Sequence, residues 1–150
     1  MTEVYLIRHA KKSNNIIYQN AEDNFLIKDE KRILSKEGQE QSKMLASLSF
    51  LQDTDVIFSS HFVRAMLTAN YLAEKIKKPI LINKNFGERL RTNNENIIFP
   101  KNYRMMQMKD EKYKVIGGES RQEVFKRFYN ELMKIIKEYE NKKIVIISHK

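Results

Sequence analysis

Two apolar runs, one near each end of the chain, each lead into a histidine. The first, at residues 4–7, is followed by Arg8 and His9, and the second, at 143–148, is followed by His149. Uninterrupted apolar runs of this length predict strands buried on both faces, as in a parallel sheet covered by helices. Such sheets bind ligands outside the carboxyl ends of their strands. The two histidines and the arginine therefore predict a site for an anion.

The size and composition of the chain limit its class. It has 150 residues, no cysteine, and 28 Lys+Arg against 19 Asp+Glu, a net charge of +9. We expect a single domain over residues 1–150 without disulfides. Neither a membrane span of roughly 20 apolar residues nor a secretion signal is recognisable, which predicts a cytoplasmic protein without membrane contact. The positive charge favours anionic partners, but the basic residues are scattered, so no nucleic-acid partner is expected.

The order of the predicted elements indicates the fold class. Strands are expected at residues 3–7, 55–59, 79–83 and 143–148, with helical patterns between them at 36–51 and 62–76. Strands that alternate with helices imply right-handed crossovers. We therefore expect an α/β fold, a three-layer sandwich whose mostly parallel central sheet is flanked by helices.

The remaining stretches divide into one clear helix and two irregular segments. Ser120 and Glu123 form a capping box that predicts the start of the last helix. Its buried stripe is expected to consist of apolar residues at helical spacing, namely Phe125, Phe128, Leu132, Ile135 and Tyr139. Residues 14–33 and 91–116 are polar and lack sustained periodicity, so they are expected to be irregular and to be functional or mobile.

Charged side chains follow the predicted strands. Because the carboxyl ends of parallel strands share one edge, we expect a common pocket for five residues, Arg8, His9, Arg64, Glu88 and His149. Arginine's planar fork matches the oxygens of a phosphate. A histidine in such a field can attack phosphorus and form a phosphohistidine, and a glutamic acid can protonate the leaving oxygen. This chemistry needs neither a metal nor a cofactor.

These residues resemble motifs of the histidine phosphatase superfamily, also called the phosphoglycerate mutase-like family. Arg8-His9-Ala10 stands where the family has Arg-His-Gly, and Ser148-His149 resembles its closing Ser-His-Gly. Three further stretches are similar to family motifs: 34–41 (Leu-Thr-x-x-Gly-x-x-Gln), 59–69 (Ser-Ser-Pro-x-x-Arg-Ala-x-x-Thr-Ala) and 117–120 (Gly-Gly-Glu-Ser). The five stretches occur in the family's order and span nearly the whole chain.

The resemblance implies a role for each matching residue. His9 would be the phosphorylated nucleophile, and three side chains would form the phosphate clamp, namely Arg8, Arg64 and His149. Asn15 falls where many members place a phosphate-contacting asparagine. Glu88 is expected to be the proton donor, because residues 86–89 resemble an acidic-Arg pair after the third strand. An alternative register leaves Asn83 in the place of the acid.

The chain departs from the family pattern at three positions. Ala10 replaces a glycine, and His61 occupies the usual proline position, where it is either a rim histidine or without a role. Lys150 stands where a glycine is usual. Family members continue beyond this point with another helix, so we expect a truncated carboxyl-terminal end.

The resulting hypothesis is a metal-independent phosphatase that hydrolyses phosphate esters through a phosphohistidine on His9. The expected partner is a small phosphorylated substrate or a phosphoprotein. Two alternatives stay open, a phosphoglycerate mutase-type phosphoryl transferase and a catalytically inactive phosphate-binding relative. The short chain favours the phosphatase, because the family's mutases carry extra inserted segments.

Overall fold

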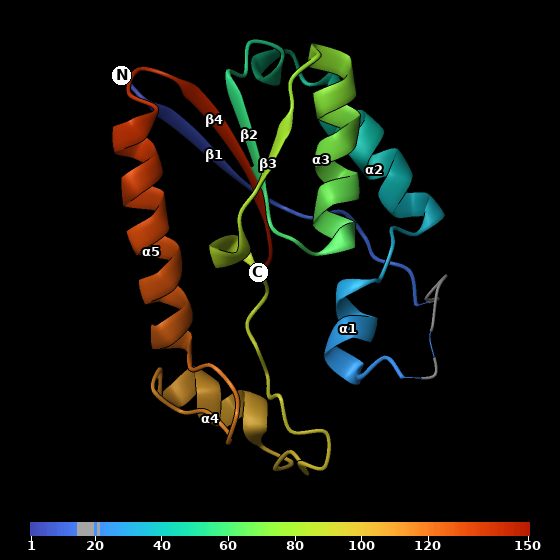
Figure 1. Ribbon diagram of the computed structural model, residues 1–150, viewed down its shortest axis with the longest axis vertical. Coiled ribbons are helices and arrows are strands. Elements are labelled where there is room, and N and C mark those ends of the chain that lie inside the picture. The colour runs from blue at the N-terminus through green and yellow to red at the C-terminus, as the bar shows by residue number, and fades with distance from the viewer. Residues whose placement is uncertain (15–19, 21) are drawn as a thin grey trace. The chain divides into compact units, whose positions relative to one another are not determined.

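The computed structural model describes residues 1–14, 20 and 22–150 (Figure 1). Asn15, predicted to contact phosphate, lies outside these residues. The strands are β1 (Glu3–Arg8), β2 (Val56–Ser59), β3 (Ile80–Ile82) and β4 (Lys143–Ser148). The helices are α1 (Phe25–Glu30), α2 (Lys36–Ser47), α3 (Val63–Ile76), α4 (Tyr103–Lys109) and α5 (Arg121–Glu138), with short 3₁₀ turns η1 (Ser49–Leu51) and η2 (Lys84–Phe86). No helix within the described residues is long and apolar enough to cross a membrane.

The four strands form one parallel sheet in the order β1-β4-β2-β3. Arg8 pairs with Ser148, and Ser59 pairs with both Ile147 and Ile82. This register brings the four carboxyl ends to the same edge, which Figure 1 shows near the C label. The predicted strands and the α/β fold class with a parallel sheet and surrounding helices are confirmed.

The central strand β4 is buried on both faces, as its unbroken apolar run predicted. Val145 and Ile147 face the core cluster that α2 and α3 contribute to, and both are fully buried. Ile144 and Ile146 point to the opposite face and are also fully buried. On that face Phe58, the partner of Ile146 across β2, contacts other aromatic rings, those of Phe86 and Tyr139. The strand that delivers His149 is therefore the best-anchored part of the sheet.

Strand β1 differs from the prediction that it is buried on both faces. It lies at the edge of the sheet, and only one of its faces, with Tyr5 and Ile7, packs against the core cluster. Leu6 points to the other face and is 56% exposed. An apolar run alone does not distinguish an edge strand from a central one, because strand order is a property of the tertiary fold.

Both segments expected to be irregular contain a short helix. Asn24 caps α1 by accepting a hydrogen bond from the N–H of Ile27. In α4, Tyr103 and Gln107 are one turn apart, and the two buried side chains share a hydrogen bond of 2.8 Å. Helices of six and seven residues are too short to establish a periodic pattern in the sequence.

The last helix begins as predicted but buries less of its stripe. The side chain of Ser120 accepts from the N–H of Glu123, and the Glu123 carboxylate accepts from the N–H of Ser120, which is a reciprocal capping box. Ile135 is buried at 3% exposure, but Phe125 is 66% exposed. Phe125 stacks instead on Tyr129, which is also exposed. Placing Phe125 in the buried stripe was wrong, because its neighbours on the first turns do not cover it.

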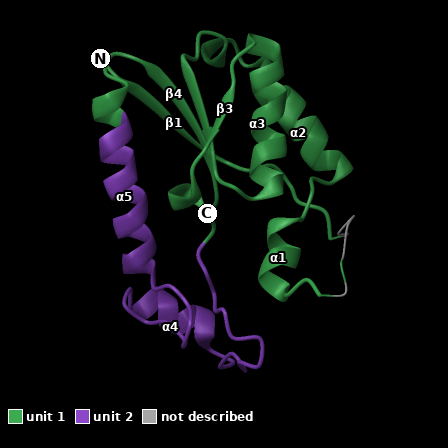
Figure 2. Ribbon diagram, in the orientation of Figure 1, with its two compact units in different colours: residues 1–88, 136–150 green, residues 89–135 purple. Residues whose placement is uncertain are grey.

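The chain divides into two compact units, residues 1–88 with 136–150 and residues 89–135 (Figure 2). The first unit contains the sheet. Within the second, Glu119 forms a two-pronged ion pair with Arg127 and also accepts from the N–H of Leu90. These contacts assign a structural role to Glu119 in the Gly-Gly-Glu-Ser stretch. The expectation of a single domain stays a prediction.

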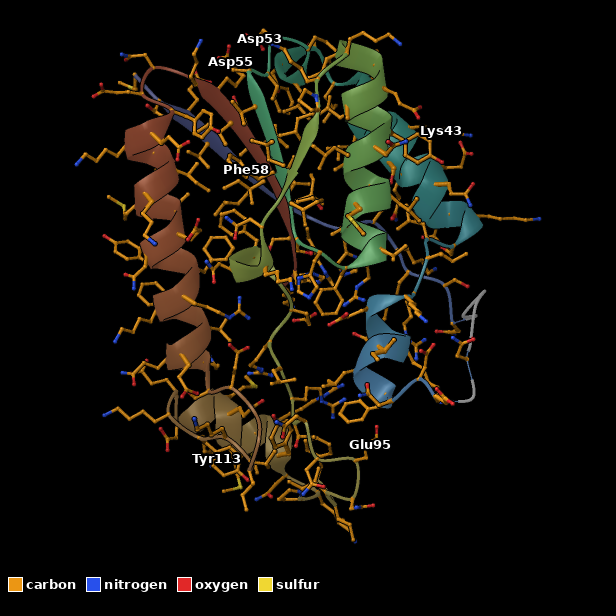
Figure 3. All side chains as sticks on the ribbon, viewed as in Figure 1. Lys43, Asp53, Asp55, Phe58, Glu95 and Tyr113 are labelled. Atoms are coloured by element: carbon orange, nitrogen blue, oxygen red, sulfur yellow. The ribbon has the colours of Figure 1, made fainter. Side chains whose placement is uncertain are left out.

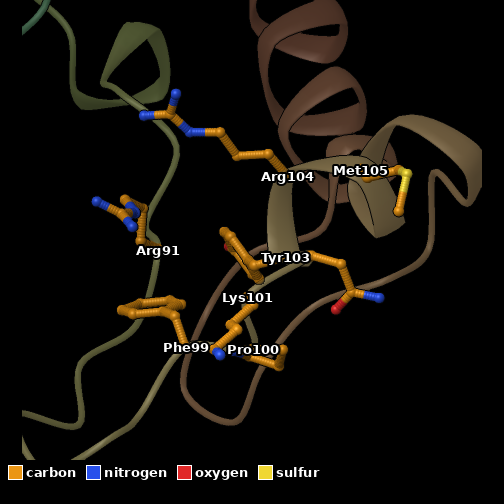
Figure 4. A pocket seen from close by; sticks show the side chains of 8 residues that line it. Arg91, Phe99, Pro100, Lys101, Tyr103, Arg104 and Met105 are labelled. Carbon is orange, nitrogen blue, oxygen red and sulfur yellow. The ribbon is translucent and has the colours of Figure 1, made fainter.

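The second unit also carries an open pocket of about 550 Å³ (Figure 4). The Arg91 guanidinium lies over the ring of Phe99, 4.6 Å from its centre, and the Phe99 ring contacts that of Tyr103. Most of the other lining residues are exposed, including Lys101 and Arg104. The pocket is therefore basic with an aromatic wall.

Two carboxylates, those of Asp53 and Asp55, lie at the amino-terminal edge of the sheet (Figure 3). Asp53 accepts two hydrogen bonds from the Lys143 ammonium, at 2.6 and 2.7 Å, and Asp55 accepts from the Lys143 main-chain N–H. The Lys143 hydrogen bonds hold the pKa of both carboxyl groups below the usual range. This edge serves to join β2 to β4, whereas the candidate site lies at the opposite edge.

Candidate active site

The imidazole of His9 is held at both ring nitrogens. The main-chain N–H of His9 donates to the carbonyl of Ser148, which continues the pairing of β1 with β4 by one residue. Nδ1 lies 2.7 Å from the carbonyl oxygen of Ala10, which can only accept, so Nδ1 carries the proton. The lone pair is then on Nε2, which accepts from Nε of Arg64 at 3.2 Å. This tautomer presents a nucleophilic nitrogen toward the arginine.

The residues after His9 are anchored to two helices. The N–H of Ala10 donates to the hydroxyl of Thr68, which in turn donates to the carbonyl of Arg64 on the same helix, α3. The carbonyl of Lys11 approaches the first turn of α2 so closely that a Cβ at Gly38 would collide with it. Gly38 and Thr68, which lie in the recognised motifs at 34–41 and 59–69, therefore both contact the segment after His9.

Arg64 is the centre of the site, although its side chain is only 1% exposed. Its Nη2 lies 3.5 Å from Nδ1 of His149 and 4.0 Å from a carboxylate oxygen of Glu88. Its guanidinium carbon lies 4.5 Å from the centre of the Phe62 ring. Burial lowers the pKa of Arg64 from its ordinary value, while carboxylates nearby oppose that shift. Phe62, buried at the start of α3, supports the guanidinium from one face.

His149 contacts the same group of side chains from β4. Its side chain is 3% exposed, and its ring centre lies 5.0 Å from that of His9. Nε2 lies 2.8 Å from the hydroxyl of Ser60, while Nδ1 faces Arg64 and a Glu88 oxygen 3.6 Å away. Ser60 follows β2 directly, so the order of the strands explains why it reaches a histidine 89 residues away.

Glu88, the expected proton donor, and Asn83, its alternative, lie in different surroundings. Glu88 directs its carboxylate to Arg64 and His149. Asn83 uses its side chain to cap η2, where it accepts from the N–H of Asn85 at 2.9 Å. The geometry thus favours Glu88 over Asn83 as the group near the phosphate clamp.

Arg8 belongs to this cluster by charge rather than by contact. Its side chain is exposed, and none of the described residues forms a hydrogen bond with it. Its positive charge still contributes to the electrostatics of His9. Burial, with the charges of Arg64, Arg8 and Lys12, lowers the pKa of His9 from 6.5 to about 4, while the bond to Ala10 opposes the shift. The ring is therefore neutral, and nucleophilic, at physiological pH.

Several residues of the site were not predicted from the sequence. Asp29 of α1 accepts from Arg64 through both its main-chain and its side-chain oxygens. Its neighbour Glu30 lies 3.4 Å from Nε2 of His61, so His61 contacts a helix that the sequence did not reveal. Ser60 and Thr68 lie within recognised motifs, but the sequence did not indicate their hydrogen-bond partners. Only the position of Ser60 and Thr68 in those motifs could have marked them.

Within residues 1–14, 20 and 22–150, no group of three or more His, Cys, Asp or Glu side chains is arranged to hold a metal ion. The polar atoms that converge are instead guanidinium, imidazole and carboxyl groups, a set suited to binding a phosphoryl group and transferring protons.

The parallel α/β sheet with an arginine between two histidines at its carboxyl edge is an arrangement suited to binding a phosphoryl group. Residues 4–150 match the model of the histidine phosphatase superfamily, branch 1. The chain belongs to this family, and it is a phosphatase of the histidine type. It is 30% identical over 158 residues to phosphoserine phosphatase 1 of Hydrogenobacter thermophilus, covering 99% of this chain and 71% of that protein. The expected family and enzyme class are thereby confirmed.

Solved structures agree with this assignment. A mutant phosphoserine phosphatase from Entamoeba histolytica in complex with phosphoserine superposes with a TM-score of 0.74 at 25% identity, covering 99% of this chain and 74% of that one. Mycobacterial glucosyl-3-phosphoglycerate phosphatase with inorganic phosphate gives a TM-score of 0.73 at 19% identity, covering 96% and 71%. At this lower identity the likeness shows the shared fold.

Proposed function

We propose that the protein hydrolyses small-molecule phosphate monoesters through a covalent phosphohistidine on His9. The observation that carries this proposal is the 3.2 Å contact between Nε of Arg64 and Nε2 of His9. It joins a cation suited to phosphoryl oxygens directly to a neutral ring nitrogen whose lone pair can attack phosphorus. A cytoplasmic location stays a prediction.

In the first step, Nε2 of His9 releases the N–H of Arg64, its lone pair attacks phosphorus, and the bond to the ester oxygen breaks. Glu88 in its protonated form donates its proton to that oxygen, and the alcohol leaves. The carbonyl of Ala10, 2.7 Å from Nδ1, stabilises the positive charge that the phosphorylated ring acquires. Arg64 and Arg8 neutralise the charge on the transferring group, which is the main electrostatic contribution to phosphoryl transfer, and His149 completes the clamp as a polar contact.

In the second step, water attacks the phosphohistidine and the P–N bond breaks. The Glu88 carboxylate accepts a proton from that water, and the electron pair of the broken bond returns to Nε2 of His9. Orthophosphate is released, and Glu88 is again protonated for the next cycle. All groups of this scheme lie in the first unit of the structure, residues 1–88 with 136–150.

We propose L-phosphoserine as the substrate to examine first. The support is the pair of relatives at 30% and 25% identity that are named phosphoserine phosphatases. Asn15, at its family position, is proposed as a further phosphate contact. Two alternatives are compared with hydrolysis of phosphoserine, namely hydrolysis of a phosphoprotein and phosphoglycerate mutase activity.

The test is a release assay for inorganic phosphate over phosphoserine, other small monoesters, a phosphopeptide and 3-phosphoglycerate. We expect release from phosphoserine and its loss in His9→Ala. Rapid quenching of the reaction should trap the phosphohistidine, detected as an acid-labile, base-stable phosphoryl label on the protein. The label should be absent in His9→Ala and present in His61→Ala, a matched removal of a different imidazole. Phosphate binding without label or release, or isomerisation without release, would overturn the proposal.

A further inference from the structure

The carboxylate of Asp29 contacts the guanidinium of Arg64, where the proposed function places a phosphoryl group. Nη2 of Arg64 lies 3.2 Å from a side-chain oxygen of Asp29, and Nη1 donates to the main-chain carbonyl of Asp29 at 2.8 Å. The same Nη2 faces His149 and Glu88, the other members of the site. In the free protein, the arginine that would bind phosphate is therefore already satisfied by an internal anion.

This internal anion is charged and belongs to a weakly packed helix. Burial raises the pKa of Asp29, but Arg64, Lys12 and Arg32 together outweigh that effect and hold it below the usual range. None of the six residues of α1 is fully buried: of its three apolar side chains, Phe25 and Ile27 are 38% and 37% exposed and Leu26 is partly buried. Polar contacts therefore dominate the docking of α1, unlike that of α3.

The polar contacts of α1 include two with residues around the start of α3. Asp29 pairs with Arg64, and its neighbour Glu30 lies 3.4 Å from Nε2 of His61. A contact made by a fully buried guanidinium is worth more than one on the surface, because it is less screened by solvent. Of the two, the contact with Arg64 is the one that a phosphate would disturb.

We propose that Asp29 determines the phosphate affinity of the site, because its carboxylate competes with the phosphoryl group of substrate and product for Nη2 of Arg64. The inference rests on the proposed function in placing the phosphoryl group at Arg64. Two anions that share the Nη2 amino group of Arg64 repel each other, so bound phosphate weakens the attachment of α1, and attached α1 weakens phosphate binding. The two effects must be equal in size, since coupling between binding events is reciprocal.

The competition has a consequence for turnover. Orthophosphate, the product, interacts with the protein mainly through the phosphoryl clamp, whereas a substrate has additional contacts through its ester group. A carboxylate that returns to Arg64 after hydrolysis therefore favours departure of the product. Removing its charge should strengthen product inhibition more than it lowers KM.

The first test measures orthophosphate binding by calorimetry in Asp29→Asn. Asparagine retains the size of the side chain, and the main-chain contact with Arg64 is unaffected. We expect about 5-fold to 150-fold tighter binding, the usual range of coupling between sites. The matched control is Asp23→Asn, which removes an equal charge from the same segment at a carboxylate paired with Lys31 instead of Arg64. Its phosphate affinity should equal that of the native chain.

The second test measures hydrogen exchange of the amides of α1 at saturating phosphate. Ligand binding ordinarily slows exchange around a site, whereas competition with Asp29 predicts faster exchange in residues 25–31. In Asp29→Asn, phosphate should leave the exchange of these amides unchanged. Slower exchange in the native chain, or equal or weaker phosphate binding by Asp29→Asn, would overturn the inference and assign Asp29 to orienting Arg64.

Arg64→Ala separates this inference from the proposed function. Loss of phosphate binding in Arg64→Ala, with no gain in Asp29→Asn, overturns the role of Asp29 alone. Unchanged phosphate binding in Arg64→Ala overturns the phosphate site itself, and the inference with it. Thermal unfolding of each variant verifies that the fold is retained.

Discussion

Nε of Arg64 donates a hydrogen bond to Nε2 of His9 across a distance of 3.2 Å. Fifty-five positions separate the two residues, and the contact forms because β1 and α3 both meet the carboxyl edge of the sheet. The arginine therefore fixes the direction of the nucleophilic lone pair before any phosphate arrives.

The first prediction concerns the shape of the cation at position 64. Arg64→Lys retains a positive charge but loses the planar fork that contacts His9 and His149 at once. We expect kcat/KM for a phosphomonoester to fall by about 100-fold to 1,000-fold. Steady-state kinetics measures this, with Arg104→Lys on the exposed face of α4 as the control. A loss of less than 5-fold would mean that charge alone suffices.

The second prediction concerns the titration of His9. Its pKa of about 4 means that the folded protein leaves the ring neutral between pH 6.5 and 4, where an unfolded chain protonates it. The unfolded state then binds more protons, so the free energy of unfolding falls as the pH decreases through this window. After allowance for solvent screening we expect a loss of about 1–2 kcal/mol, with no contribution from His9 above pH 6.5.

NMR titration of the imidazole measures this pKa directly, and urea unfolding at a series of pH values measures the stability. In His9→Asn the corresponding part of the pH dependence should vanish. An NMR midpoint near 6.5 would show that the ring is solvated and that burial does not control its charge.

The third prediction concerns the proton donor. In Glu88→Gln the leaving alcohol no longer receives a proton, so we expect kcat for an alkyl phosphate to fall by about 100-fold to 10,000-fold. A nitrophenyl phosphate, whose leaving group departs as an anion, should be affected far less. The control is Asn83→Ala, which removes the cap of η2 and should leave the ratio of the two substrates unchanged. Equal losses for both substrates in Glu88→Gln would argue against proton donation.

The fourth prediction concerns the attachment of the nucleophile segment to α2. In Gly38→Ala the new Cβ collides with the Lys11 carbonyl, two residues after His9. Main-chain atoms cannot move aside as a flexible side chain can, so we expect a loss of about 1–3 kcal/mol in the free energy of unfolding and lower activity. Gln39→Ala, at an exposed position of the same turn, should change stability by less than about 0.5 kcal/mol. Unchanged urea unfolding in Gly38→Ala would show that α2 shifts freely.

The parts of the site that the sequence predicted are those attached to regular elements. His9, His149 and Glu88 each follow a strand that an apolar run marked, and Arg64 follows the second strand on the next helix. Their convergence could be expected because parallel strands align their carboxyl ends. Asp29 could not be expected in the same way, since α1 lacks both length and a buried face.

The sequence by itself determined the four strands, the three longer helices, the capping box at Ser120 and the family. Local patterns are sufficient for these features, because each depends on neighbours within a few turns or residues. Only the tertiary structure decided that β1 is an edge strand with Leu6 exposed, that Phe125 is uncovered, and that a carboxylate of α1 occupies Arg64. These features depend on which distant surfaces meet, and that follows from the packing of the whole chain rather than from any one segment.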